Sequence, residues 1–180
     1  MKEKPVNLSG AGGKTMSKSY SYLFSGTKGS IIHDKDIIKS VSRGKVKAWA
    51  KEKRNSLTGE AKKKFNTACI VYDEATGKCY YGINGGYKEE GYIKNPILFG
   101  DDYHPGILPQ SPLNKYPVGN CAEVDAVNRA LNDGASLSNL HMTTIHTTKK
   151  KFGEYKPSCA NCIHTFKGRI KENYSGWENL

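Results

Sequence analysis

The stretch that follows the first 30 residues has a helical period of apolar and polar positions. Residues 34–54 carry apolar side chains on one face and basic side chains on the other, which predicts an amphipathic helix. Asp34 or Asp36 caps this helix in our interpretation, and Gly44 is a candidate break within it. The apolar face comprises Ile37, Ile38, Val41, Val46 and Trp49.

The next apolar segments have the composition of strands. Residues 66–72 and 78–83 are rich in β-branched and aromatic residues, and the polar residues 73–77 between them predict a turn. The two segments are therefore expected to form a hairpin. Cys69 and Cys79 are offset along such a ladder, so we expect reduced, buried thiols; a disulfide framework is the alternative.

Three further elements complete the pattern. Residues 120–132 predict a helix, residues 140–148 predict a strand, and Cys159 begins another helix. The segment around Trp177 could add a short final strand. The order helix, strand, strand, helix, strand, helix is typical of an α/β layer in which helices pack on a small sheet.

Two segments lack any apolar period. Residues 1–30 are rich in Gly, Ser, Lys and Tyr and are predicted to be a flexible tail or linker, which leaves one domain at residues 31–180. Residues 10–15 look like a phosphate loop, but Leu8 stands where such a loop needs its first glycine. Residues 87–119 form a long, proline-rich loop that leads into Cys121, so we expect it over the mouth of a site.

The net charge of the chain indicates which class of partner it is expected to bind. The chain has 28 basic and 17 acidic residues, a net charge of +11, which favours a polyanion such as nucleic acid. Apolar runs are too short to span a bilayer, and the first residues lack the apolar region of a signal peptide. Basic residues gather on the predicted first helix, at 62–64 and at 149–151; a solvated surface is the alternative to phosphate contact.

Two short motifs carry the candidate chemistry. Cys121 is followed two residues later by Glu123, and Cys159 and Cys162 stand three apart after Pro157. Each cysteine motif opens a predicted helix, so the sulfurs of both motifs can meet at one ion. Three thiolates hold Zn²⁺ and leave its fourth position for water, as in catalytic zinc sites.

A carboxylate two residues from a ligand suits proton transfer. Glu123 is the candidate shuttle, and a non-ligand Glu with a later cysteine pair is the signature of zinc-dependent base deaminases. The competing interpretation is a structural zinc site that His164 completes as fourth ligand, with His141 and His146 less well placed.

Substrate contacts are less specific in the sequence. Asn84 ends the second strand and could hold a sugar or base edge; a simple turn residue is the alternative. His104 in the long loop could stack on a base or contact phosphate; a plain loop histidine is the alternative. Asn120, Ala122 and Ser158 are further candidates. Four loop tyrosines offer stacking platforms beside basic residues, as single-strand binders use: Tyr87, Tyr92, Tyr103 and Tyr116.

Residues 119–167 resemble the YwqJ-related deaminase family of bacterial polymorphic toxins. The resemblance rests on residues 119–130 (GNCAEVDAVNRA) and 156–162 (KPSCANC). It implies a cytidine deaminase-like fold, with a single mixed sheet of about five strands between helices in three layers. It also implies zinc at the three cysteines and a proton shuttle at Glu123.

The same resemblance implies a biological setting. The chain would be the C-terminal toxin module of a secreted effector, acting in the target-cell cytoplasm and neutralised by a cognate immunity protein. We expect a monomer that deaminates cytosine to uracil in nucleic acid, with DNA favoured. Two alternatives stay open: the same chemistry on RNA or on free nucleosides and nucleotides, adenine included, and a zinc-stabilised nucleic-acid-binding module without catalysis.

Overall fold

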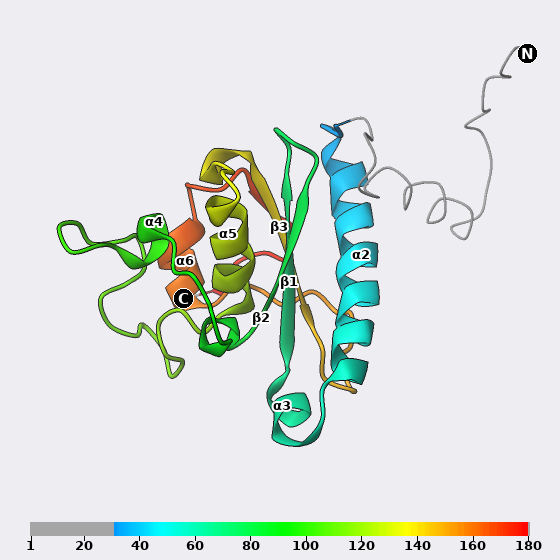
Figure 1. Cartoon of the computed structure of the whole chain (residues 1–180). Coiled ribbons are helices and arrows are strands. Elements are labelled where there is room, and N and C mark those ends of the chain that lie inside the picture. Colours follow the sequence, from blue (N-terminus) through cyan, green and yellow to red (C-terminus); the bar gives the residue numbers. More distant parts are fainter. Residues whose placement is uncertain (1–30, 180) are drawn as a thin grey trace, which may run out of the picture.

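Helices cover both faces of one mixed sheet (Figure 1). The computed structural model describes residues 31–179, so the tail or linker expected at residues 1–30, with its glycine-rich run, lies outside the described part. The long helix α2 (Lys35–Ser56) lies on one face of the sheet, and α5 (Ala122–Asn132) and α6 (Ala160–Phe166) lie on the other. The expected three-layer α/β arrangement is therefore confirmed.

Helix α2 begins at a side-chain cap and continues without a break. The carboxylate of Asp34 accepts hydrogen bonds from the backbone N–H groups of Asp36 and Ile37, which satisfies two donors of the first turn. The expected break at Gly44 is absent, because residues 35–56 form one helix. The buried stripe Ile38, Val41, Val46 and Ala50 holds it against the sheet.

The described residues form four strands in the order β2-β1-β3-β4. β1 (Thr67–Asp73) pairs antiparallel with β2 (Cys79–Ile83) and with β3 (Leu140–His146), so the hairpin expected from the sequence is confirmed. Cys69 lies opposite Gly82 and Cys79 lies opposite Tyr72, an offset of three positions, and both cysteines are free thiols. Cys69 is buried as expected, whereas Cys79 is only half-buried because it lies on the edge strand β2.

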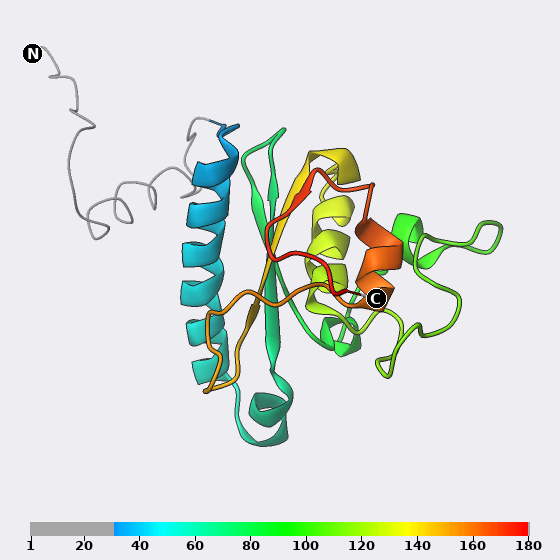
Figure 2. The same cartoon turned by 180° about the vertical axis from the view of Figure 1, so that it is seen from behind.

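The last strand is short, and the described residues form four strands where the resemblance to the deaminase family implies about five. β4 (Glu172–Asn173) pairs parallel with β3 over two residues. The chain then leaves the ladder: the N–H of Thr144 donates to the Ser175 hydroxyl, and that hydroxyl donates to the carbonyl of Thr144. Trp177, where the sequence placed a final strand, makes one isolated bridge to Ser158. Figure 2 shows this C-terminal segment, in red, running from β4 to a point beside α6.

Alternation along the central strand divides the core into two halves. Ala68 and Ile70 of β1 face α2, where they pack with Val46 and Ala50. Cys69 and Val71 face the other way and pack against α5 and α6. Every residue of β1 is buried, as expected for a central strand with helices on both faces.

Short helices complete the described fold. They are α3 (Gly59–Lys64), the 3₁₀ turns η1 (Gly86–Lys88) and η2 (Leu137–Asn139), and α4 (Pro96–Phe99). Leu98 of α4 is fully buried in the core half that contains α5, so the long loop is anchored beside that helix. Within the described residues, no helix is both long and apolar enough to cross a membrane.

Candidate metal centre

Three cysteine side chains meet at one point on the α5 and α6 side of the sheet. Cys121 is the N-cap residue of α5, Cys159 is the N-cap residue of α6, and Cys162 lies one turn into α6. The sulfurs of Cys121 and Cys159 are 3.4 Å apart, and all three sulfurs lie within 4.8 Å of one another. These residues form a clustered group that could bind a metal ion.

The sulfur separations fit a tetrahedral zinc site. Zn–S bonds of about 2.3 Å at tetrahedral angles place sulfurs about 3.8 Å apart, which is within the spacing seen here. Hydrogen bonds from the other two thiols lower the pKa of Cys159 to about 2, and the same bonds raise the pKa of Cys121 and of Cys162. These contacts therefore favour the thiolate, which is the form that binds metal, at Cys159.

Glu123 lies beside this cluster in the first turn of α5. Its side chain is buried, and burial raises the pKa of its carboxyl above the usual value. The amine of Lys156 and the hydroxyl of Ser158 act in the opposite direction. Ser158 lies 3.2 Å from Glu123, Oγ to Oε1. A buried carboxylate with a charged partner and a hydroxyl partner has the surroundings of a proton-transfer group.

A pocket of about 80 Å³ opens onto these groups. Its walls include Cys121, Cys159 and Glu123 from the two helix starts, together with Thr67 from β1 and Lys156 from the loop before α6. Larger hollows of about 380 Å³ beside Arg129 and about 420 Å³ along α2 lack the cysteines. The chemistry therefore selects the smaller pocket as the candidate site.

The structure brings most of the predicted contact residues to this pocket. Asn84, Asn120 and Ala122 line it. Ser158 is fully buried behind it and reaches Glu123 instead. His104 does not join them: its side chain is 82% exposed, and its ring faces Asp101 at 3.4 Å within the loop.

Asn84 lines the pocket and also joins neighbouring elements through hydrogen bonds. Its side-chain oxygen accepts hydrogen bonds from the N–H groups of Asn66 and Thr67, and its amide donates to the carbonyl of Lys64. These bonds tie the end of β2 to the start of β1 and to Lys64, the last residue of α3. Helix α2 lies on the opposite face of the sheet from α5 (Figure 1).

Sequence reasoning missed Lys156, Thr67 and Glu178 as pocket residues. Lys156 donates to the Thr67 hydroxyl, which holds its amine at the pocket. The place of Lys156 immediately before Pro157 was a usable signal, whereas Glu178 comes to the pocket only through the path of the C-terminal segment.

The histidines proposed as a fourth metal ligand lie elsewhere. His164 is exposed on α6 and does not belong to the sulfur cluster. His141 is buried on β3, where it bonds Glu74 and Tyr174. Within the described residues, the cluster therefore offers three protein ligands, which is the count of a catalytic zinc site.

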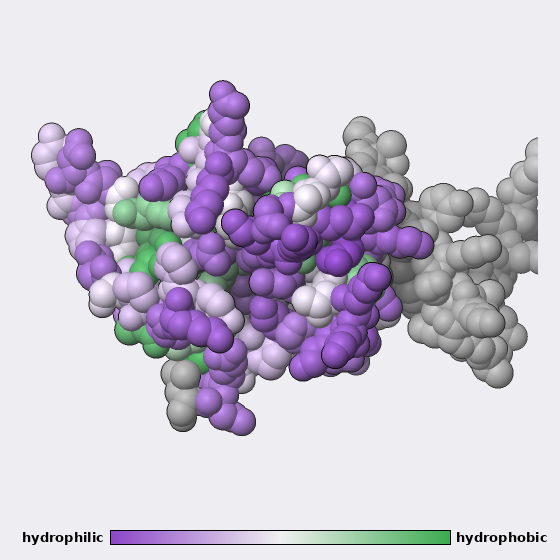
Figure 3. All heavy atoms as spheres, turned by 90° about the horizontal axis from the view of Figure 1, so that it is seen from below, coloured by the Kyte–Doolittle hydropathy of each residue, from purple (hydrophilic) through white to green (hydrophobic). Residues whose placement is uncertain are grey.

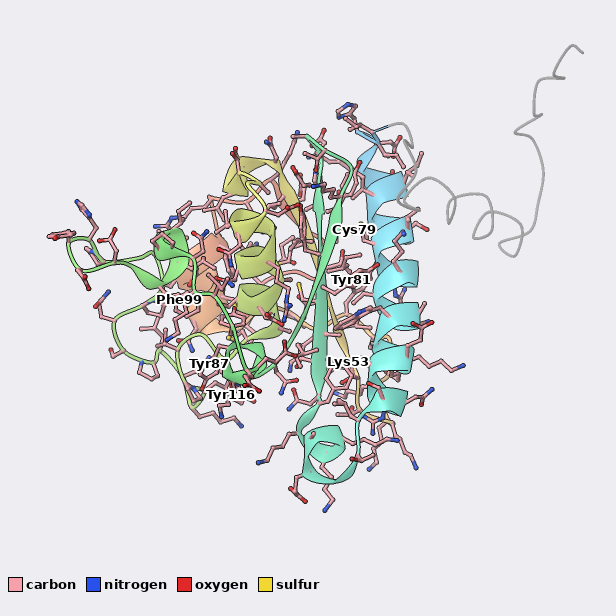
Figure 4. The ribbon with its side chains drawn as sticks, viewed as in Figure 1. Lys53, Cys79, Tyr81, Tyr87, Phe99 and Tyr116 are labelled. Atoms are coloured by element: carbon pink, nitrogen blue, oxygen red, sulfur yellow. The ribbon has the colours of Figure 1, made fainter. Side chains whose placement is uncertain are left out.

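Three aromatic rings on the α5 side of the sheet have a lysine amine beside them. The amines of Lys115, Lys88 and Lys94 lie 5.4, 5.5 and 5.3 Å from the ring centres of Tyr116, Tyr87 and Phe99, respectively. Tyr116 lines the pocket, and Figure 4 shows all three rings on the α5 side of the sheet, away from α2.

Backbone contacts place the other two rings near the first ligand. A Cβ added at Gly119 would meet the ring of Phe99 at 3.2 Å, and the Gly85 N–H donates to the carbonyl of Asn120. Gly119 and Asn120 directly precede Cys121, and Tyr87 follows Gly85 by two residues. The rings are thus close to the start of α5.

Comparison with known proteins adds no relative. No family model matches the chain, and neither the curated proteins nor the solved structures contain a significant match.

Proposed function

We propose that this chain is a zinc-dependent hydrolytic deaminase that converts cytosine to uracil in nucleic acid, with DNA as the favoured substrate. The observation that carries the proposal is the buried carboxylate of Glu123 in one pocket with three clustered cysteine sulfurs. The resemblance of residues 119–167 to the YwqJ-related deaminases and to their cytidine deaminase-like fold points the same way. By that resemblance, the chain acts as a toxin module with an immunity partner.

The residues have distinct roles in the proposed reaction. Cys121, Cys159 and Cys162 would hold zinc, which when bound supplies Lewis-acid activation of water. Glu123 accepts a proton from the attacking water and delivers it to the ring nitrogen of cytosine. The oxygen of that water bonds to the amino-bearing carbon. Glu123 then takes the remaining proton from that oxygen and delivers it to the amine, which leaves as ammonia when the C–N bond breaks, so cytosine and water yield uracil and ammonia.

Charge and aromatic surface favour a polymeric substrate over a free nucleoside. A single nucleoside needs no basic surroundings, whereas this chain has a net charge of +11 and three lysine–aromatic pairs near the pocket. Such pairs bind single strands through base stacking and phosphate attraction. Figure 3 shows mostly hydrophilic residues on the face viewed from below, the end that carries α3. A base must leave its duplex to enter a pocket of this kind.

A direct assay tests the proposal. The zinc-loaded protein is incubated with single-stranded DNA, duplex DNA, RNA and free nucleosides, and products are sequenced or separated chromatographically. We expect uracil in place of cytosine, fastest in single-stranded DNA. Conversion confined to RNA or to free nucleosides would show that the substrate belongs to that class and not to DNA. Conversion of adenine would show that the target base is not cytosine.

Glu123→Gln separates catalysis from binding. This change keeps the shape of the side chain and removes the proton acceptor, so we expect zinc and nucleic acid to bind while deamination stops. Glu74→Gln is the matched control, because Glu74 is also a buried glutamate but contacts histidines away from the cysteine cluster. It should lower stability and leave deamination intact. A Glu123→Gln protein with full biological effect would favour a non-catalytic binding module.

A further inference from the structure

Ser158 and Asn173 form a chain of hydrogen bonds that ends on Glu123. The side-chain amide of Asn173 lies 3.0 Å from the Ser158 hydroxyl, Nδ2 to Oγ, and that hydroxyl lies 3.2 Å from Oε1 of Glu123. Ser158 is fully buried and Glu123 is nearly so, so water cannot readily replace either partner. The direction of each bond therefore determines how the carboxylate is held.

The orientation of the Asn173 amide follows from its backbone partners. Its oxygen accepts from the N–H of Ser175, and its nitrogen donates to the carbonyl of Gly176 at 2.9 Å. A flipped amide would put its N–H groups against the N–H of Ser175 and its oxygen against the oxygen of Gly176. The nitrogen must therefore face Ser158, and the bond between them is one that Ser158 accepts.

The direction of the second bond follows from the first. A serine hydroxyl has one proton and two lone pairs. Because Asn173 supplies a proton to one lone pair, the hydroxyl proton of Ser158 is free for its other neighbour. That neighbour is Oε1 of Glu123, and an ionised carboxylate oxygen accepts a hydrogen bond more strongly than a neutral oxygen does.

We propose that Asn173 and Ser158 are positioning residues that hold the Glu123 carboxylate in one orientation for the deamination reaction. This inference rests on the proposed function. The bond from the Ser158 hydroxyl to Oε1 restrains rotation of the carboxylate and so fixes the orientation of both of its oxygens. Neither Asn173 nor Ser158 needs to touch the substrate for this purpose.

The short strand β4 positions Asn173 in this arrangement. Pairing of Met142 with Asn173 fixes the place of the asparagine on the sheet. The backbone of Ser158 is bonded to the same C-terminal segment, through Gly176 and Glu178. Ser158 thus occupies the place between Pro157 and Cys159 where its hydroxyl reaches the shuttle, which accounts for the serine that separates the proline from the first cysteine of the pair.

Kinetics of three variants test the positioning role. Ser158→Ala should lower kcat by about 10- to 100-fold, since a small misplacement of a reacting group has an effect of that order, while KM and zinc content stay near wild type. Ser158→Thr keeps the hydroxyl and should restore most of kcat. Ser175→Ala is the matched control, because this buried serine bonds the backbone of Thr144. Unchanged kcat in Ser158→Ala, or an equal loss in Ser175→Ala, would overturn the inference.

A spectroscopic measurement tests the same bond without any activity. In the wild-type protein, nuclear magnetic resonance should show a slowly exchanging Ser158 hydroxyl proton close to the Asn173 amide protons. Glu123→Ala removes its acceptor, so this signal should be lost while the Asn173 amide signals remain. Persistence of the hydroxyl signal in Glu123→Ala would show that the proton points elsewhere, and the inference would fail.

The two tests separate the inference from the proposed function. If the wild-type protein deaminates no substrate, the proposed function fails, and the hydroxyl signal alone decides whether Ser158 orients Glu123. If Ser158→Thr proves misfolded by thermal unfolding, Ser158→Ala and the hydroxyl signal decide.

Discussion

The sulfur atoms of Cys121 and Cys159 lie 3.4 Å apart, although 38 residues separate them in the chain. Each is the N-cap residue of its helix, and β3 lies between the two helices in sequence. The contact therefore depends on both helices starting at the same place over one face of the sheet. Changes that move either helix should affect the cluster even where they touch no ligand.

Metal binding should require Cys162 but not Cys79. Cys162→Ser replaces one of three clustered sulfurs, so we expect a large loss of zinc measured by elemental analysis, and a lower Tm. At free zinc about 1,000-fold above Kd, binding stabilises the fold by about 4 kcal/mol, and a chelator should remove that amount. Cys79→Ser is the control, because Cys79 is on the far hairpin strand. Wild-type protein without zinc, or Cys162→Ser with full zinc, contradicts the metal site.

Gly82 should tolerate no side chain. A Cβ at this position of β2 would lie 2.3 Å from both the carbonyl oxygen of Ala122 and the nitrogen of Ala126, which are backbone atoms of α5. Gly82→Ala must therefore push α5 outward, and we expect a destabilisation of about 1–3 kcal/mol or more, with weaker zinc binding.

Gly44 provides the matched control for Gly82. It lies inside α2 with no atom within 4 Å of an added Cβ. Gly44→Ala should therefore stabilise the protein by about 0.5–1 kcal/mol through helix propensity. Urea unfolding measures both variants, and equal effects of the two substitutions would contradict the close approach of β2 to α5.

Tyr116 should contribute to binding of single-stranded DNA. It lines the pocket beside Lys115, and base stacking on an aromatic ring contributes about 1–3 kcal/mol. Tyr116→Ala should weaken affinity by that amount in fluorescence anisotropy. Tyr103→Ala is the control, because Tyr103 is 87% exposed in the same loop and does not line the pocket. Affinity of the wild type should fall steeply with added salt, whereas a flat response would count against a polyanionic substrate.

Glu74 should stabilise the fold above about pH 4.5 and lose that contribution in acid. Contact with Lys171, and with His141 and His33, lowers the pKa of Glu74 from 4.5 to about 2. A carboxyl with a depressed folded-state pKa contributes fully above its unfolded value, and the contribution falls as the pH drops from about 4.5 to about 2. The stability difference between the wild type and Glu74→Gln should therefore shrink across this range.

Urea unfolding at several pH values measures that difference. Glu60→Gln is the matched control, because Glu60 forms an exposed pair with Lys63, and such pairs contribute about 0–1 kcal/mol. A difference for Glu74→Gln that stays constant from pH 7 to pH 3 would contradict the proposed role of the Lys171 contact.

Local patterns predicted most of the elements, because each pattern reflects forces that act over a few residues. The hairpin of β1 and β2 follows from strand composition on either side of a polar turn, and the offset of Cys69 and Cys79 follows from its register. Gly44 shows the limit of this reasoning: a glycine weakens an isolated helix, but packing of the buried stripe of α2 on the sheet outweighs that cost.

The sequence by itself determined the three-cysteine motif, Glu123, the α/β class and the strongly basic charge, because spacing and composition express these directly. Only the tertiary structure decided that Lys156 and Glu178 line the same pocket as Glu123, that Ser158 bonds its carboxylate, that His104 stays outside, and that the last strand is two residues long. Those features depend on where distant segments lie once helices and strands have packed, and no pattern of neighbouring residues records such long-range contacts.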